Sequence, residues 1–170
     1  VVDPAAGTVS FWFRPGPEWL DRKGNFHYFR AGHLALTLFP DGISFMTGRT
    51  DDGKFHWDYS CGTSSIRSWK PGEWHHFAVT WDRNAQQKAI WLDGELAKMS
   101  KTTVFPDRIQ PEGEFIFAEF PGEYDEFAVW TRALAPAEIA KLCGYPELIP
   151  EGLGLVAEPV ERTLPMQYKC

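Results

Sequence analysis

The chain has 170 residues, which is enough for one domain whose core needs no disulfide support. It carries 17 Lys and Arg against 23 Asp and Glu, a formal net charge of −6, and its basic residues are scattered. Nucleic acids and anionic membrane surfaces attract clustered positive charge, so neither is expected as a partner. No apolar stretch approaches the length of about 18 residues that a membrane-spanning helix needs, so we expect no insertion into a membrane.

Short segments with strand character recur along the chain and are separated by Gly, Pro and Asp turns. The predicted strands cover residues 8–14, 26–29, 34–39, 43–46, 54–60, 74–81, 89–92, 114–119 and 124–130. This pattern predicts an all-β fold in which two antiparallel sheets form a jelly-roll sandwich.

Residues 71–94 form the clearest predicted hairpin. Phe77, Val79 and Trp81 alternate with His76, Ala78 and Thr80, so the two sets point to opposite faces of the strand. The return strand is followed by Asp93-Gly94, a pair that tight turns favour.

One helix is predicted near the end of the chain. It begins at Ala135-Pro136, presents Ile139 and Leu142 on one face, and ends at Gly144. The four prolines that follow predict an extended, proline-rich tail over 145–170.

The three cysteines, Cys61, Cys143 and Cys170, have no C-x-x-C spacing, which argues against a zinc site. One disulfide with one thiol and three thiols are both compatible with this number. Cys143 with Cys170 is the pair to test first, because it would tie the tail to the domain.

Three segments resemble the laminin-G-like domains of the concanavalin A-like lectin/glucanase superfamily. Residues 7–15 (GTVSFWFRP) resemble an early strand, 73–82 (EWHHFAVTWD) with 91–94 (WLDG) a central hairpin, and 124–134 (YDEFAVWTRAL) with Glu138-Ile139 the closing segment and helix. The resemblance implies a concanavalin A-like jelly roll over residues 1–144, followed by the tail. The family's opening strand would lie upstream of Gly7, where residues 1–6 are too short to hold it, so that strand is cut away, supplied elsewhere or absent.

Members of this family mostly act as non-catalytic modules of extracellular or cell-envelope proteins, and many hold a structural calcium ion. The resemblance therefore implies a carbohydrate-binding or adhesion module of a larger secreted or cell-envelope protein, located outside the cell, in the periplasm or in the envelope. Its partner would be a glycan or another protein chain. A purely structural domain that contacts other subunits is the alternative, and a degenerate glycoside hydrolase is the second alternative.

The candidate ligand-binding residues are Arg49, Asp51, His56, Trp57 and Tyr59. Flat rings stack on the C–H faces of sugars, while carboxylates and guanidinium groups bind the hydroxyls. The alternative is that the rings only cover one end of the sandwich, as large aromatic residues commonly do. For Trp57 both interpretations remain open.

Two carboxylates of the predicted strand 124–130 and its start are candidates for catalysis or metal binding. Glu123 and Asp125 could share one strand face, as the acid pair of a glycosidase must, but Phe127 stands where the next carboxylate would be, so no hydrolysis is expected. Asp125 matches the family residue that often contributes to calcium binding and is the candidate ligand.

Other conspicuous residues are interpreted as structural. His75 and His76 are adjacent on a strand and point to opposite faces, so they cannot chelate one ion together. Trp19 and Trp69 are predicted to pack over the ends of the sandwich.

Overall fold

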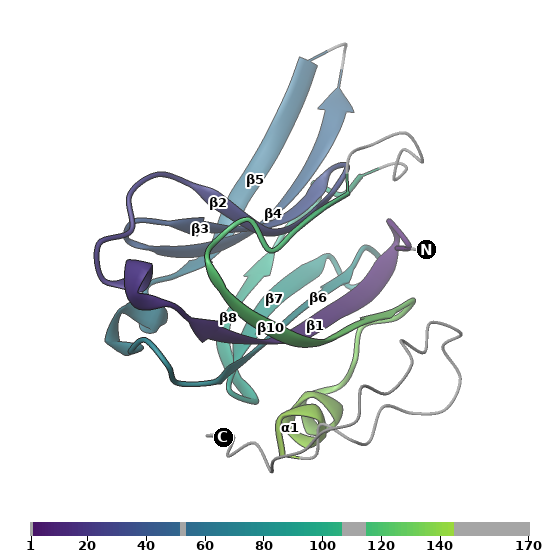
Figure 1. Cartoon of the computed structure of the whole chain (residues 1–170). Helices are drawn as coiled ribbons and strands as arrows, with labels where there is room; N and C mark the ends of the chain where they lie inside the picture. The colour runs from purple at the N-terminus through teal and green to yellow at the C-terminus, as the bar shows by residue number, and fades with distance from the viewer. Residues whose placement is uncertain (1, 52–53, 107–114, 145–170) are drawn as a thin grey trace.

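The computed structural model describes residues 2–51, 54–106 and 115–144 (Figure 1). Their elements follow in the order β1 (Ala6–Pro15), η1 (Pro17–Trp19), β2 (Phe26–Ala31), β3 (Leu34–Phe39), β4 (Gly42–Asp51), β5 (Lys54–Thr63), η2 (Ser65–Ser68), β6 (His75–Asp82), β7 (Gln87–Leu92), β8 (Glu95–Lys101), β9 (Phe115–Phe117), β10 (Gly122–Trp130) and α1 (Pro136–Gly144).

The strands form two five-stranded antiparallel sheets. Sheet A has the order β10-β1-β6-β7-β8 and sheet B the order β5-β4-β3-β2-β9. The sheets stack face to face, and α1 lies against the far side of sheet A (Figure 1). The predicted jelly-roll sandwich is confirmed, with β8 as a strand that the sequence analysis missed. The predicted tail over 145–170 lies outside the described residues.

The core between the sheets is aromatic, and alternation along each strand builds it. Phe77, Val79 and Trp81 of β6 face this core, as predicted. Phe13 and Tyr28 complete its centre, with ring centroids 5.1 Å apart, and the Tyr28 ring lies 4.8 Å from that of Phe77. Tilted and edge-on pairs at this spacing add about 0.5–1.5 kcal/mol each beyond area burial, so the rings fix how the sheets stack.

A second apolar layer lies between sheet A and α1. Ala78 and Trp91 of the sheet pack there against Ile139 and Leu142 of the helix, which are the residues predicted to form its buried face. The helix begins where the Glu138 carboxylate accepts a hydrogen bond from the backbone N–H of Ala135 at 2.8 Å. Both faces of sheet A are therefore covered, which explains why Ala78, on the supposedly polar side of β6, is 1 % exposed.

The hairpin between β7 and β8 uses the predicted Asp93-Gly94 pair. Both residues have positive φ, 50° and 80°, as the tightest antiparallel turn requires. The Asp93 carboxylate accepts hydrogen bonds from the backbone N–H of His76 and from Nδ1 of His75, each at 2.9 Å. This residue thus fixes the turn to the neighbouring strand β6.

Two loop tryptophans are core residues, as predicted. Trp19 and Trp69 stack with centroids 6.1 Å apart, and Nε1 of Trp19 donates to the carbonyl of Trp69 at 3.0 Å. His75 in turn lies flat on Trp69 at 3.7 Å. The interpretation of these rings as packing residues is confirmed.

Cys61 is a buried free thiol, and burial raises its pKa to about 11, so it is unreactive at neutral pH. Cys143 is disulfide-bonded. Cys170, the partner to test first, lies outside the described residues. No helix in the described part of the chain is long and apolar enough to cross a membrane.

Candidate functional site: an aromatic ribbon

The end of the β4–β5 hairpin projects beyond the rest of sheet B (Figure 1). Pairing between β3 and β4 begins at Leu34 and Thr47, and the Gly48 N–H adds a hydrogen bond to the carbonyl of His33 at 2.8 Å. Residues 48–51 of β4 are in register with residues 54–57 of β5, beyond the pairing with β3. We call these two segments the ribbon. Because β3 does not pair along residues 49–51, this edge of the ribbon has no neighbouring strand in the described part of the chain.

One face of the ribbon gathers aromatic side chains. The rings of Phe55 and Trp57 meet edge to face with centroids 5.0 Å apart, and His33, from the β2–β3 turn, lies 4.7 Å from Phe55. Arg30 of β2 places its Cζ 6.0 Å from the centre of the Trp57 ring. We call Arg30, His33, Phe55 and Trp57 the ring cluster. Phe55 is 42 % exposed, so the cluster offers apolar ring surface to solvent.

Gly48 makes room for these rings. It lies opposite Trp57 in the strand register, and a Cβ atom there would stand 2.6 Å from Cζ of Phe55 and 3.0 Å from Cε3 of Trp57. Real Cβ atoms do not approach other atoms so closely. The rings therefore rest directly on the backbone of β4.

The opposite face of the ribbon carries the charged candidates. Arg49 donates from Nε to Oδ2 of Asp51 at 2.6 Å and from Nη1 to the carbonyl of Thr103 at 3.0 Å. His56 pairs with Arg49 in the register and shares this side of the ribbon. The five residues predicted from the sequence are thus divided: Arg49, Asp51 and His56 lie on one side and Trp57 on the other. Tyr59, two residues beyond Trp57, is 56 % exposed.

A buried lysine holds the base of the ribbon. Lys88 of β7 crosses the sandwich and donates from Nζ to the carbonyl of Asp58 at 2.7 Å and to Oγ1 of Thr47 at 3.2 Å, with Oδ2 of Asp58 at 3.3 Å. Burial lowers the pKa of Lys88, and the Asp58 charge opposes this. Burial raises the pKa of Asp58, but hydrogen bonds from Thr102 and Ser60 and the Lys88 charge outweigh it, so its pKa is lowered. These contacts position β5 next to Trp57.

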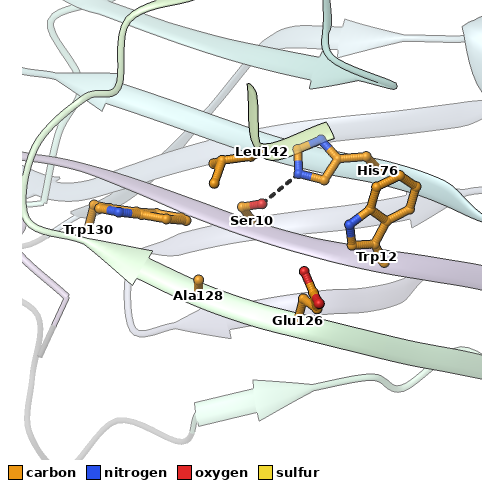
Figure 2. A pocket seen from close by; sticks show the side chains of 7 residues that line it. All are labelled: Ser10, Trp12, His76, Glu126, Ala128, Trp130 and Leu142. Carbon is orange, nitrogen blue, oxygen red and sulfur yellow. Dashed lines mark hydrogen bonds between the residues drawn. The ribbon is translucent and has the colours of Figure 1, made fainter. Parts of the chain in front are cut away.

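A second cluster that includes polar side chains lies under α1, around a cavity of about 10 Å³ (Figure 2). Its walls include Ser10, His76, Glu126 and Trp130. Ser10 Oγ and His76 Nε2 are hydrogen-bonded at 2.7 Å, the spacing of a nucleophile and its base. A cavity of this size holds about one water molecule and no substrate, so this pair is structural. As predicted, His75 and His76 point to opposite faces of β6.

The carboxylates of β10 do not form a glycosidase pair. In the register, Glu123 lies opposite Arg14 and Asp125 opposite Trp12, which places both on one face of sheet A as predicted. Glu123, however, is ion-paired with Arg14. Phe127 lies on the other side of the strand, with its ring 4.4 Å from that of Phe117. Among the described carboxylates of β10, Glu123 is therefore the partner of Arg14 rather than a second acid beside Asp125.

Calcium at Asp125 stays a prediction. The Asp125 carboxylate accepts a hydrogen bond from the backbone N–H of Glu126 at 2.8 Å. Across residues 2–51, 54–106 and 115–144, no group of three or more His, Cys, Asp or Glu side chains could hold a metal ion. The described side chains therefore do not supply the oxygen set that calcium needs, and we derive no chemistry through it.

Comparison with known proteins identifies the family. Residues 1–140 match the Laminin G 3 family, described as the concanavalin A-like lectin/glucanases superfamily. The chain belongs to this family. No curated protein matches the chain significantly.

Several solved structures share the fold of this concanavalin A-like domain. They include the receptor-binding domain of botulinum neurotoxin C/D mosaic serotype (TM-score 0.63, 12 % identity, 82 % of this chain and 36 % of that chain). They also include the botulinum neurotoxin serotype D ligand-binding domain in complex with N-acetylneuraminic acid (0.59, 12 %, 82 % and 36 %) and the binding domain of Paraclostridial Mosquitocidal Protein 1 (0.59, 17 %, 82 % and 37 %). The domain spans little more than a third of these chains. At such identities the likeness shows the fold alone.

Three members of the ring cluster were absent from the sequence prediction. Phe55 could have been found, because a residue two positions from Trp57 on a strand shares its face. Arg30 and His33 come from another hairpin, and only the pairing of β2, β3 and β4 brings them to the ribbon. Local spacing carries no signal for such a contact.

Proposed function

We propose that this domain is a non-catalytic carbohydrate-binding module of a larger secreted or cell-envelope protein, with a role in adhesion. The observation that carries the proposal is the ring cluster, in which Phe55, Trp57 and His33 form a partly exposed apolar surface bordered by the Arg30 guanidinium. A pyranose ring has an apolar C–H face and a polar rim. It can therefore lie on an aromatic ring while its hydroxyls reach neighbouring donors.

Two further observations support this proposal. The family includes lectins by its description, and one protein of similar fold was solved with N-acetylneuraminic acid bound. The cluster also needs little rearrangement, because Gly48 leaves the space into which the rings pack and the Lys88–Asp58 pair anchors the base of the ribbon. A ligand loses less free energy to ordering when its site is already arranged.

A glycan array with and without calcium tests the proposal, with Trp57→Ala as the informative variant. We expect the parent to bind and Trp57→Ala to lose binding, while both unfold at the same temperature. His56→Ala is the matched control, because it removes a ring from the adjacent residue on the opposite face and should leave binding intact. If the parent binds no glycan in either condition, the module is not a lectin.

A structural role in contact with another chain is the second candidate, and strand β8 favours it. This strand is at the edge of sheet A, and Leu96 and Met99 are 48 % and 45 % exposed on it. An edge strand with exposed apolar side chains can receive a partner. Under this candidate, Leu96→Glu would abolish a complex seen by light scattering and leave glycan binding unchanged, whereas a monomeric parent would argue against it.

A further inference from the structure

We propose that the ring cluster selects sugars that bear an anionic group, and that Arg30 receives this group. The proposal rests on the carbohydrate-binding function proposed for the same surface. The further step is that the ligand is anionic and that Arg30 binds its charged group.

Arg30 is a guanidinium held at the cluster without a carboxylate partner. Its Cζ lies 6.0 Å from the centre of the Trp57 ring, and its Nε makes a long contact of 3.5 Å with the carbonyl of Gly32. Within the described residues no carboxylate oxygen lies within 4.0 Å of it, whereas four other arginines are each paired with an acidic side chain: Arg14, Arg49, Arg67 and Arg132.

The position of Arg30 makes its charge effective. It is half-buried in sheet B and directed over the ring face, so its charge is less screened than on an open surface. Its neighbour on this sheet, His27, responds to it: burial lowers the pKa of His27, Glu119 opposes this, and the Arg30 charge lowers it further. The protein has a net charge of −6, so a guanidinium without a carboxylate within 4.0 Å among the described residues stands out on an acidic molecule.

The chemistry of the guanidinium matches an anionic sugar. Its planar set of N–H donors binds a carboxylate with two parallel hydrogen bonds and also accepts a sulfate ester. A sugar stacked on Trp57 would bring a substituent of its rim to Arg30, the cluster's charged member. A neutral sugar could stack equally well but would lack the charge-assisted hydrogen bonds.

The test compares three soluble probes, sialyllactose, sulfated lactose and lactose, by isothermal titration calorimetry against the parent, Arg30→Gln and Arg49→Gln. We expect the parent to bind at least one acidic probe about tenfold or more tightly than lactose, and Arg30→Gln to reduce this affinity to the lactose level. The two acidic probes distinguish a carboxylate from a sulfate as the recognised group. Arg49→Gln removes the same charge from the opposite face, where Asp51 already neutralises it, and should bind like the parent.

Each contrary result has a distinct meaning. If lactose binds as tightly as both acidic probes, or if Arg30→Gln and Arg49→Gln weaken binding equally, the assignment of Arg30 is overturned. A glycan array in which only neutral glycans bind, in a Trp57-dependent manner, overturns this inference but leaves the carbohydrate-binding function standing. Failure of the parent to bind any sugar overturns both.

Discussion

Acidification should destabilise this domain through His76, which lies in the layer under α1. His76 is 1 % exposed, hydrogen-bonded to Ser10 Oγ at 2.7 Å, with its ring centroid 5.2 Å from that of Trp12. Burial lowers its pKa to about 4, and the nearby Asp93 charge offsets only part of this effect. The folded domain therefore holds a neutral imidazole that the unfolded chain would protonate near pH 6.5.

The size and sign of the effect follow from this difference. The pKa is lower in the folded state by roughly 2.5 units, and each unit corresponds to about 1.4 kcal/mol, so the full effect is about 3 kcal/mol. Between pH 6.5 and pH 4 the unfolded chain binds the extra proton, so the free energy of unfolding falls as the pH falls. Above pH 6.5 both states are neutral at this position and the effect vanishes.

Urea unfolding of the parent and of His76→Gln, measured from about pH 7 to pH 4, isolates the contribution. At pH 7 the variant should be less stable, because Gln fits the buried site less well. Its deficit should shrink by about 3 kcal/mol on acidification, since it has no imidazole to protonate. His56→Gln, on the exposed ribbon, is the control and should follow the parent. Parallel pH profiles for the parent and His76→Gln would refute the reasoning.

Two further predictions concern the ribbon. Lys88→Met should lower the free energy of unfolding by about 2–3 kcal/mol in chemical denaturation, which is less than the 3–5 kcal/mol typical of a broken buried ion pair because Asp58 is partly solvated. Adding Asp58→Asn removes the unpaired charge and should restore most of this stability. A double variant no more stable than the single one would contradict this. Gly48→Ala should displace the rings of Phe55 and Trp57 and weaken glycan binding at least tenfold, at a cost in stability below about 1 kcal/mol, because flexible ring edges rather than backbone must move. Unchanged glycan binding by Gly48→Ala would show that the ring positions are irrelevant to recognition.

The fold was predictable because its signals are local. Alternation along β6, the Asp93-Gly94 turn and the proline at the start of α1 each depend on a few neighbouring residues. Strand β8 (ELAKMSK) was missed because it is an edge strand whose apolar residues do not alternate. A register shift opposite Ile90 and Trp91 places Leu96 and Met99 on the same side despite their odd spacing.

The candidate site was only partly predictable, because some of its contacts join residues that are far apart in the sequence. Proximity in the chain grouped His56 with Trp57, although adjacent residues on a strand point apart. Two partners of Trp57, Arg30 and His33, come from β2 and the β2–β3 turn, and a register shift in β5 beyond Asp58 sets where each residue falls along β4. Such pairing depends on the assembled sheet, so Arg30 and His33 could be assigned only from the structure.

The two faces of sheet A and the ribbon of sheet B differ in how far their aromatic rings are buried. Sheet A is covered on one side by the aromatic core and on the other by α1, so most of its aromatic rings pack against one of these two layers. The ribbon extends past β3 and leaves Phe55 42 % exposed, which forgoes the free energy that burying a Phe side chain would give, about 1.5–3 kcal/mol in full. Lys88 nevertheless anchors the base of the ribbon, and Gly48 leaves the space into which its rings pack. Exposed rings on an anchored ribbon suit a stacking ligand, and we therefore propose the ribbon, rather than the cavity under α1, as the place of recognition.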